Sequence, residues 1–106
     1  ALAVVRKDSL QANLTHLSSA QYAGRGSGDA GNEQAAEWLI AKFQAAGLQP
    51  AFSGDWKQKF QVPRGKGHTS NVAGILPGND PELRNEIVVV GGHLDHLGTS
   101  GSGIYY

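Results

Sequence analysis

The sequence contains no cysteine, which excludes disulfide bonds, thiolate metal ligands and a cysteine nucleophile. A cysteine-free chain is compatible with a reducing or an oxidising compartment, so its redox environment stays open. An excess of charge is also missing, because nine Lys and Arg residues balance nine Asp and Glu residues. Without basic clusters the chain lacks the electrostatic footprint of a nucleic-acid or anionic-membrane partner, and small neutral or peptide-like substrates fit it better.

Long hydrophobic runs are absent too. No apolar stretch approaches the roughly 20 residues that span a bilayer, so we expect no membrane partner. The first residues, ALAVVRKD, place apolar side chains before charge, the reverse of a secretory signal. We therefore expect no intact signal peptide here, although a signal already removed would leave the same start. A chain of 106 residues forms one domain at most and buries roughly two-thirds of the surface that it exposes when unfolded.

Apolar spacing predicts two helices. Residues 8–19 carry leucines at i, i+4 and i+7, typical of a short amphipathic helix. Residues 32–46 carry apolar side chains at i, i+3, i+4 and i+7, with Asn32 as the expected N-cap and Gly47 as the residue that ends the helix. His16 lies beside the first apolar stripe, and we interpret it as a partly exposed structural residue.

A glycine-rich stretch, GSGDAG at residues 26–31, precedes the second helix and formally matches the dinucleotide-binding fingerprint. That fingerprint requires a buried strand before it and an acidic residue at the end of a second strand about 20 positions later. The sequence provides neither. We therefore interpret the stretch as a surface loop that uses the conformational freedom of glycine to turn into the helix.

Three strands are predicted in the second half of the chain. Residues 52–62 alternate weakly, as an exposed or edge strand does. Residues 71–77 and 86–92 form better strands, and the run IVVV at residues 87–90 has no polar alternation, as expected for a strand covered on both faces. A helix followed by strands, one of them central, predicts an α/β sandwich.

The motif GGHLDHLG, residues 91–98, begins where the last predicted strand leaves the sheet. Ligands and catalytic groups of open α/β sheets gather beyond the carboxyl ends of strands. In an extended backbone His93 and Asp95 project to the same side, which suits a metal-bound histidine whose tautomer is fixed by a nearby carboxylate. A histidine beside an aspartate also occurs in loops without metal, and catalytic zinc needs about three protein ligands.

Four blocks in this order resemble a known family: YAGRGSGDAGNEQAAEWLIAKFQAAGLQP, KQKFQV, NVAGILPGNDP and IVVVGGHLDHLG. From residue 22 onward the chain is similar to the N-terminal part of the di-zinc aminopeptidases of the aminopeptidase Y and leucyl aminopeptidase type, relatives of glutamate carboxypeptidase II. The resemblance implies the three-layer sandwich of zinc-dependent exopeptidases, a mixed β-sheet flanked by helices. It also implies peptide substrates, removal of their N-terminal residues, and a water activated by two zinc ions.

By this resemblance His93 ligates one zinc ion, and Asp95 supports that histidine without touching the metal. His96 has no fixed ligand role and is a site-rim or structural residue. The family motif that follows contains the aspartate bridging the two metals. It is not found here, so we expect the bridging aspartate, the other ligands and the glutamate base beyond Tyr106.

The resemblance makes residues 1–106 the N-terminal part of a single peptidase domain that is secreted or periplasmic. We expect this chain alone to be inactive, to bind zinc weakly and to self-associate through an exposed sheet edge. Two alternatives stay open: a non-catalytic binding module of the same fold, and an enzyme like the glutaminyl cyclases. Acidic ligands and a glutamate pair in a continuing sequence would favour the peptidase.

Overall fold

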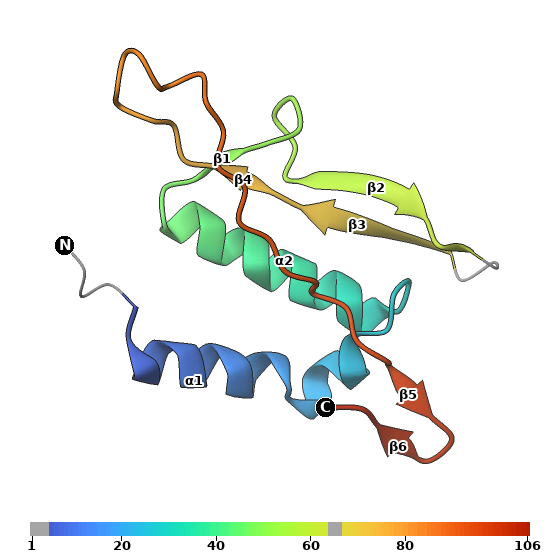
Figure 1. Cartoon of the computed structure of the whole chain (residues 1–106). Helices are drawn as coiled ribbons and strands as arrows, with labels where there is room; N and C mark the ends of the chain where they lie inside the picture. The colour runs from blue at the N-terminus through green and yellow to red at the C-terminus, as the bar shows by residue number, and fades with distance from the viewer. Residues whose placement is uncertain (1–4, 64–66) are drawn as a thin grey trace.

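A computed structural model of the chain describes residues 5–63 and 67–106 (Figure 1). The helical elements are α1 (Lys7–Leu17), the 3-10 element η1 (Ala20–Arg25) and α2 (Ala30–Ala45). The strands are β1 (Gln49–Pro50), β2 (Lys57–Gln61), β3 (His68–Val72), β4 (Gly74–Ile75), β5 (Thr99–Ser100) and β6 (Gly103–Ile104). In Figure 1, α2 lies between α1 and the β2–β3 pair, and the last part of the chain returns past α2 to the β5–β6 hairpin near η1. The predicted α/β composition is confirmed.

Helix α2 ends as its sequence predicts. Gly47 takes a left-handed φ of 78°, its N–H donates to the carbonyl of Gln44 at 3.0 Å, and the N–H of Leu48 donates to that of Phe43 at 3.0 Å. These two bonds form the Schellman motif, which satisfies carbonyls at the end of a helix. The predicted N-cap is wrong, because the helix begins at Ala30 after Asp29, and Asn32 is buried inside its first turn.

The core of the described residues lies where α2 meets η1 and β3. Its buried hydrophobic side chains are Tyr22, Ala35, Ala36, Ile40 and Val62. Helix α1 joins this core through His16, whose Nε2 lies 2.7 Å from the hydroxyl of Tyr22 and whose ring lies 5.0 Å from that of Trp38. The predicted first helix is confirmed, but α1 has no buried residue, so its leucine stripe contributes little to the core.

The strands of the described residues form antiparallel pairs: β1 with β4, β2 with β3 and β5 with β6. Strand β4 (Gly74–Ile75) continues β3 after a break at Ala73. Strand β2 pairs with β3, and β1 pairs with β4. A small loop closed by the Phe52↔Asp55 bridge separates β1 from β2. The predicted strand 52–62 is therefore confirmed for its second half, as an edge strand, and residues 71–77 contain parts of β3 and β4.

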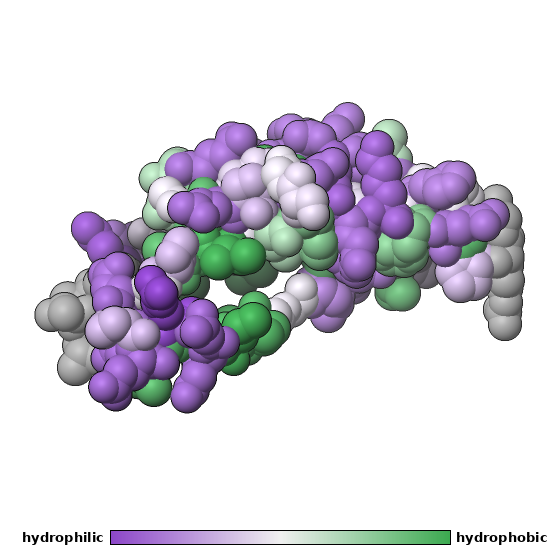
Figure 2. Space-filling model, turned by 90° about the horizontal axis from the view of Figure 1, so that it is seen from above, coloured by the Kyte–Doolittle hydropathy of each residue, from purple (hydrophilic) through white to green (hydrophobic). Residues whose placement is uncertain are grey.

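The predicted buried strand at residues 86–92 is wrong. These residues have no regular secondary structure, and their aliphatic run, residues 87–90, is between 85% and 94% exposed. A hollow separates the run from β4 and from Phe43 and Leu48. Figure 2 shows hydrophobic surface on both sides of an opening in the molecule. The run has strand composition, but no described strand pairs with it and no described layer covers it.

The overall dimensions agree with the exposure of the aliphatic run. The radius of gyration is 15.9 Å, against about 13 Å for a compact domain of this length. The accessible surface is 8189 Å², against about 5,700 Å² for a folded monomer of this mass. The excess surface means that the helices and small sheets do not enclose all the apolar side chains of the chain.

Candidate functional site

The site begins with a left-handed turn inside η1. Ala23, Gly24 and Arg25 have φ values of 45°, 70° and 49°, a conformation that costs energy for residues with a Cβ atom. Glycine is required at the middle position, because a Cβ on Gly24 would lie 2.1 Å from the carbonyl oxygen of Gly98. The turn therefore brings the backbone of η1 into direct contact with the segment that follows His93.

Backbone hydrogen bonds fasten this turn to residues 94–98. The N–H of His96 donates to the carbonyl of Arg25 at 2.9 Å, and the N–H of Gly98 donates to that of Gly24 at 2.9 Å. The Arg25 side chain adds a bond from Nε to the carbonyl of Leu94 at 3.0 Å and another from Nη1 to the carbonyl of Leu17. These contacts hold the backbone of the His-Leu-Asp-His motif from one side.

The interpretation of residues 26–31 as a surface loop is wrong for two of its three glycines. Gly26 and Gly31 are buried, and Gly26 forms a parallel bridge with His96. A Cβ on Gly31 would lie 1.9 Å from the carbonyl oxygen of Tyr22. The glycine-rich loop thus serves as a close-packed support for the His93 segment, and the stretch before it is the η1 turn rather than a strand.

His93 is held at one nitrogen. Its Nδ1 lies 2.8 Å from the backbone carbonyl oxygen of Asp95, and a carbonyl oxygen only accepts hydrogen bonds. Nδ1 is therefore assigned as the protonated nitrogen, and the lone pair of the neutral ring resides on Nε2. The side chain is 83% exposed, so Nε2 is accessible from outside.

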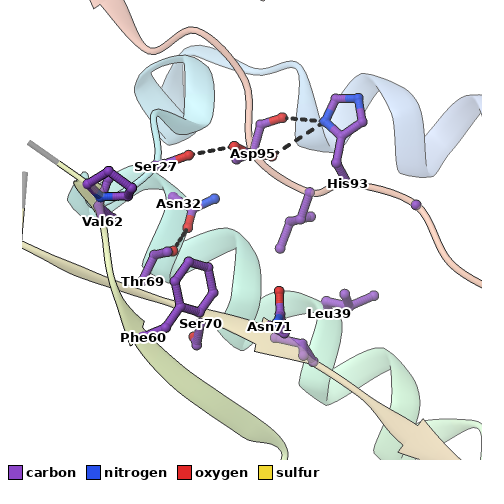
Figure 3. Close-up of a pocket in the computed structure, with 14 residues that line it drawn as sticks. Ser27, Asn32, Leu39, Phe60, Val62, Thr69, Ser70, Asn71, His93 and Asp95 are labelled. Carbon is purple, nitrogen blue, oxygen red and sulfur yellow. Dashed lines mark hydrogen bonds and ion pairs between the residues drawn. The ribbon is translucent and has the colours of Figure 1, made fainter.

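The Asp95 carboxylate lies between His93 and the glycine-rich loop. Its Oδ1 is 3.5 Å from Nδ1 of His93, and its Oδ2 accepts a hydrogen bond of 2.5 Å from Oγ of Ser27 (Figure 3). The predicted proximity of His93 and Asp95 is confirmed. Sequence reasoning missed Ser27 and Arg25, since only the fold brings them to residues almost 70 positions away.

Ser27, His93 and Asp95 border a hollow of about 280 Å³ between α2, β3 and the His93 segment. Figure 3 shows Ser27, Asp95 and His93 on one side of it, and Phe60, Asn71 and Leu39 on the other. Asn32 ties two of its walls together, because Oδ1 accepts from Oγ1 of Thr69 at 2.8 Å and Nδ2 donates to the carbonyl of Arg25 at 3.5 Å. Leu39, Phe60 and Val62 supply apolar lining.

The second histidine of the motif is placed differently. His96 is half-buried, and its backbone is committed to the Arg25 carbonyl. Within residues 5–63 and 67–106, no three His, Cys, Asp or Glu side chains come together as a group that could hold a metal ion. Within the motif, His93 combines a well-exposed imidazole ring with a nearby carboxylate, that of Asp95.

None of the helices in these described ranges combines the length and apolar composition needed to cross a bilayer. Comparisons with protein-family models, curated proteins and solved structures find no match to this chain.

Proposed function

We propose that this chain supplies one zinc ligand, His93, to a metal-dependent aminopeptidase that removes N-terminal residues from peptides with two zinc ions. The observation that carries the proposal is the hydrogen bond from His93 Nδ1 to the Asp95 carbonyl at 2.8 Å. It leaves the lone pair on Nε2 of a side chain that is 83% exposed. Metal-ligating histidines typically donate their other ring N–H to a carbonyl or carboxylate in this way.

The candidate ligand atom, Nε2 of His93, fits zinc. A neutral imidazole nitrogen is a common zinc ligand, and Asp95 stands where it can stabilise the proton on Nδ1. Bound zinc would lower the pKa of its water and polarise the scissile carbonyl. In this reaction Nε2 of His93 would be the zinc ligand, and Asp95 would fix the tautomer of the ring. The glycine-rich loop would keep the motif in place.

The proposal assigns the remaining ligands and the glutamate base to residues that follow Tyr106 in a longer protein. Catalytic zinc needs about three protein ligands, so this chain by itself would bind zinc weakly and would not hydrolyse peptides. The same proposal places residues 1–106 within a three-layer exopeptidase sandwich whose sheet continues past the aliphatic run, and in a secreted or periplasmic protein. The lack of cysteine is compatible with that location.

The test is hydrolysis of a leucine anilide by the protein continuing past Tyr106, with a zinc assay. We expect His93→Ala to reduce kcat/KM by more than about 100-fold, beyond the effect typical of losing a partner of a ligand, and to reduce bound zinc. His96→Ala is the matched control and should retain most activity. Normal activity of His93→Ala, or robust metal-dependent turnover by the 106-residue chain alone, would refute the proposal.

We also infer that the 106-residue chain self-associates in solution through its uncovered aliphatic run, residues 87–90. Patches of this kind on soluble proteins mark interaction or aggregation sites, and β-branched segments without a neighbouring strand pair readily with another copy. The large excess of accessible surface supports this inference.

A further inference from the structure

We propose that Ser27 is a positioning residue for His93 and acts through the carboxylate of Asp95. The inference rests on the proposed role of His93 as a zinc ligand. Its basis is the chain of contacts from Ser27 Oγ to Asp95 Oδ2 at 2.5 Å, and from Asp95 Oδ1 to His93 Nδ1 at 3.5 Å. Figure 3 shows Ser27, Asp95 and His93 in this order along one side of the hollow.

The need for such a residue follows from how exposed the pair is. The side chains of Asp95 and His93 are 46% and 83% exposed, so water competes for both. A free carboxylate in that position rotates among several orientations, and only some of them face Nδ1. The Ser27 hydroxyl donates to one carboxylate oxygen and thereby directs the other toward the ring.

Ser27 is itself well anchored. It follows Gly26, which is buried and bridged to His96, and the carbonyl of Gly26 accepts the N–H of Asp29 at 2.9 Å. The loop that carries the hydroxyl is therefore fixed to the same backbone that carries Asp95. A donor on a fixed loop orients its acceptor at a lower entropic cost than a donor on a mobile one.

The tautomer of the His93 ring reports this role directly, and it can be measured without an activity assay. In the metal-free chain at about pH 8, where an ordinary imidazole is neutral, nitrogen-15 NMR should show mainly the tautomer with the proton on Nδ1. Ser27→Ala should raise the Nε2–H share by about two-fold, because the backbone carbonyl of Asp95 still accepts from Nδ1 when the carboxylate turns away. It should also weaken zinc binding, read from the His93 ring resonances, by about 3- to 10-fold, less than the roughly 10- to 100-fold loss typical of removing a direct partner.

A matched pair of variants separates loss of the hydroxyl from disturbance of the fold. Ser27→Thr and Ser27→Val have nearly the same shape, and only the first keeps a donor. Thr should therefore preserve the wild-type tautomer ratio, and Val should shift it toward Nε2–H as Ala does. Ser102→Ala, which removes an exposed hydroxyl, should change nothing. The amide resonances of His96 and Gly98 show that the loop is still docked.

The outcomes distinguish this inference from the proposed function. Identical tautomer populations in the Thr and Val variants would overturn the role of Ser27. Zinc that leaves the His93 resonances unmoved while Val shifts the tautomer would refute His93 as a ligand and retain Ser27 as an orienting residue. Both effects together support both proposals.

Discussion

Two aliphatic stretches of this chain differ sharply in what surrounds them. On α2, Ala35 is fully buried and Ile40 is 8% exposed, whereas Val88 and Val90 in the aliphatic run are 90% and 94% exposed. A helix forms its backbone hydrogen bonds within itself and needs a neighbour only for its apolar face. A strand needs neighbours for both its backbone and its side chains. The comparison teaches that the described residues suffice for α2 and do not suffice for residues 86–92.

The largest expected effect concerns association. Val88→Lys combined with Val90→Lys should make the chain monomeric, because burying each aliphatic side chain stabilises an interface by about 1.5–3 kcal/mol. Sedimentation velocity over a wide concentration range measures this. The apparent mass of the wild-type chain should rise with concentration, while that of the double variant should stay constant.

The control adds the same charge elsewhere. Leu10→Lys with Leu14→Lys changes two other exposed apolar side chains, on α1, and should leave self-association largely intact. A wild-type chain that stays monomeric at high concentration would contradict the inferred self-association, and equal loss in both double variants would show that charge alone controls it.

A second prediction compares one residue type in both regions. Ile40→Ala should lower the free energy of unfolding by about 3 kcal/mol, within the range for buried isoleucine. Ile87→Ala, at a site that is 85% exposed, should change it by less than about 0.5 kcal/mol. Urea denaturation followed by circular dichroism measures both. Similar losses at the two sites would mean that residue 87 packs in a core in solution.

Glycines provide a smaller but equally direct contrast. A Cβ on Gly31 would meet the Tyr22 carbonyl, whereas one on Gly91 would have no heavy atom within 4 Å among the described residues. We expect Gly31→Ala to destabilise the fold by about 1–3 kcal/mol and Gly91→Ala to be nearly neutral. Thermal unfolding of the two variants tests this, and a destabilised Gly91→Ala would show that the aliphatic run is covered.

What could be predicted from the sequence depended on local signals. The end of α2 follows from Gly47 and Leu48, which act on carbonyls only a few positions back. The approach of Asp95 to His93 follows from their spacing of two residues along an extended backbone. Both were correct because neighbours in sequence determine them.

The features that could not be predicted depend on contacts between residues far apart in the sequence. The pattern of residues 87–90 is typical of a covered strand, but it does not say which strand would cover it, and no described residue does so. The contact from Ser27 to Asp95 joins residues 68 positions apart, and nothing around Ser27 indicates it. The burial of Asn32 likewise arises because Thr69 reaches it from β3.

The smallest expected effect is electrostatic and belongs to the packed region. The Lys57 ammonium on β2 contacts the carboxylates of Glu33 and Glu37 on α2, and its side chain is 10% exposed. Burial alone would lower the pKa of Lys57, but its hydrogen bonds to Glu33 and Glu37 and their charges outweigh burial and raise the pKa above its ordinary 10.5. Lys57→Met should cost about 1 kcal/mol, since both carboxylates stay hydrated when the ammonium is lost.

The pH dependence of that cost follows from the raised pKa of Lys57. A raised folded-state pKa stabilises the fold fully below the ordinary value of 10.5 and loses this stabilisation as pH rises through the folded value. The difference in unfolding free energy between wild type and Lys57→Met should therefore stay constant from neutral pH upward and shrink only in alkali beyond 10.5. Lys59→Met, on the same strand but exposed, should show no such difference. Equal behaviour of the two variants would mean that the Lys57 contacts do not hold β2 against α2.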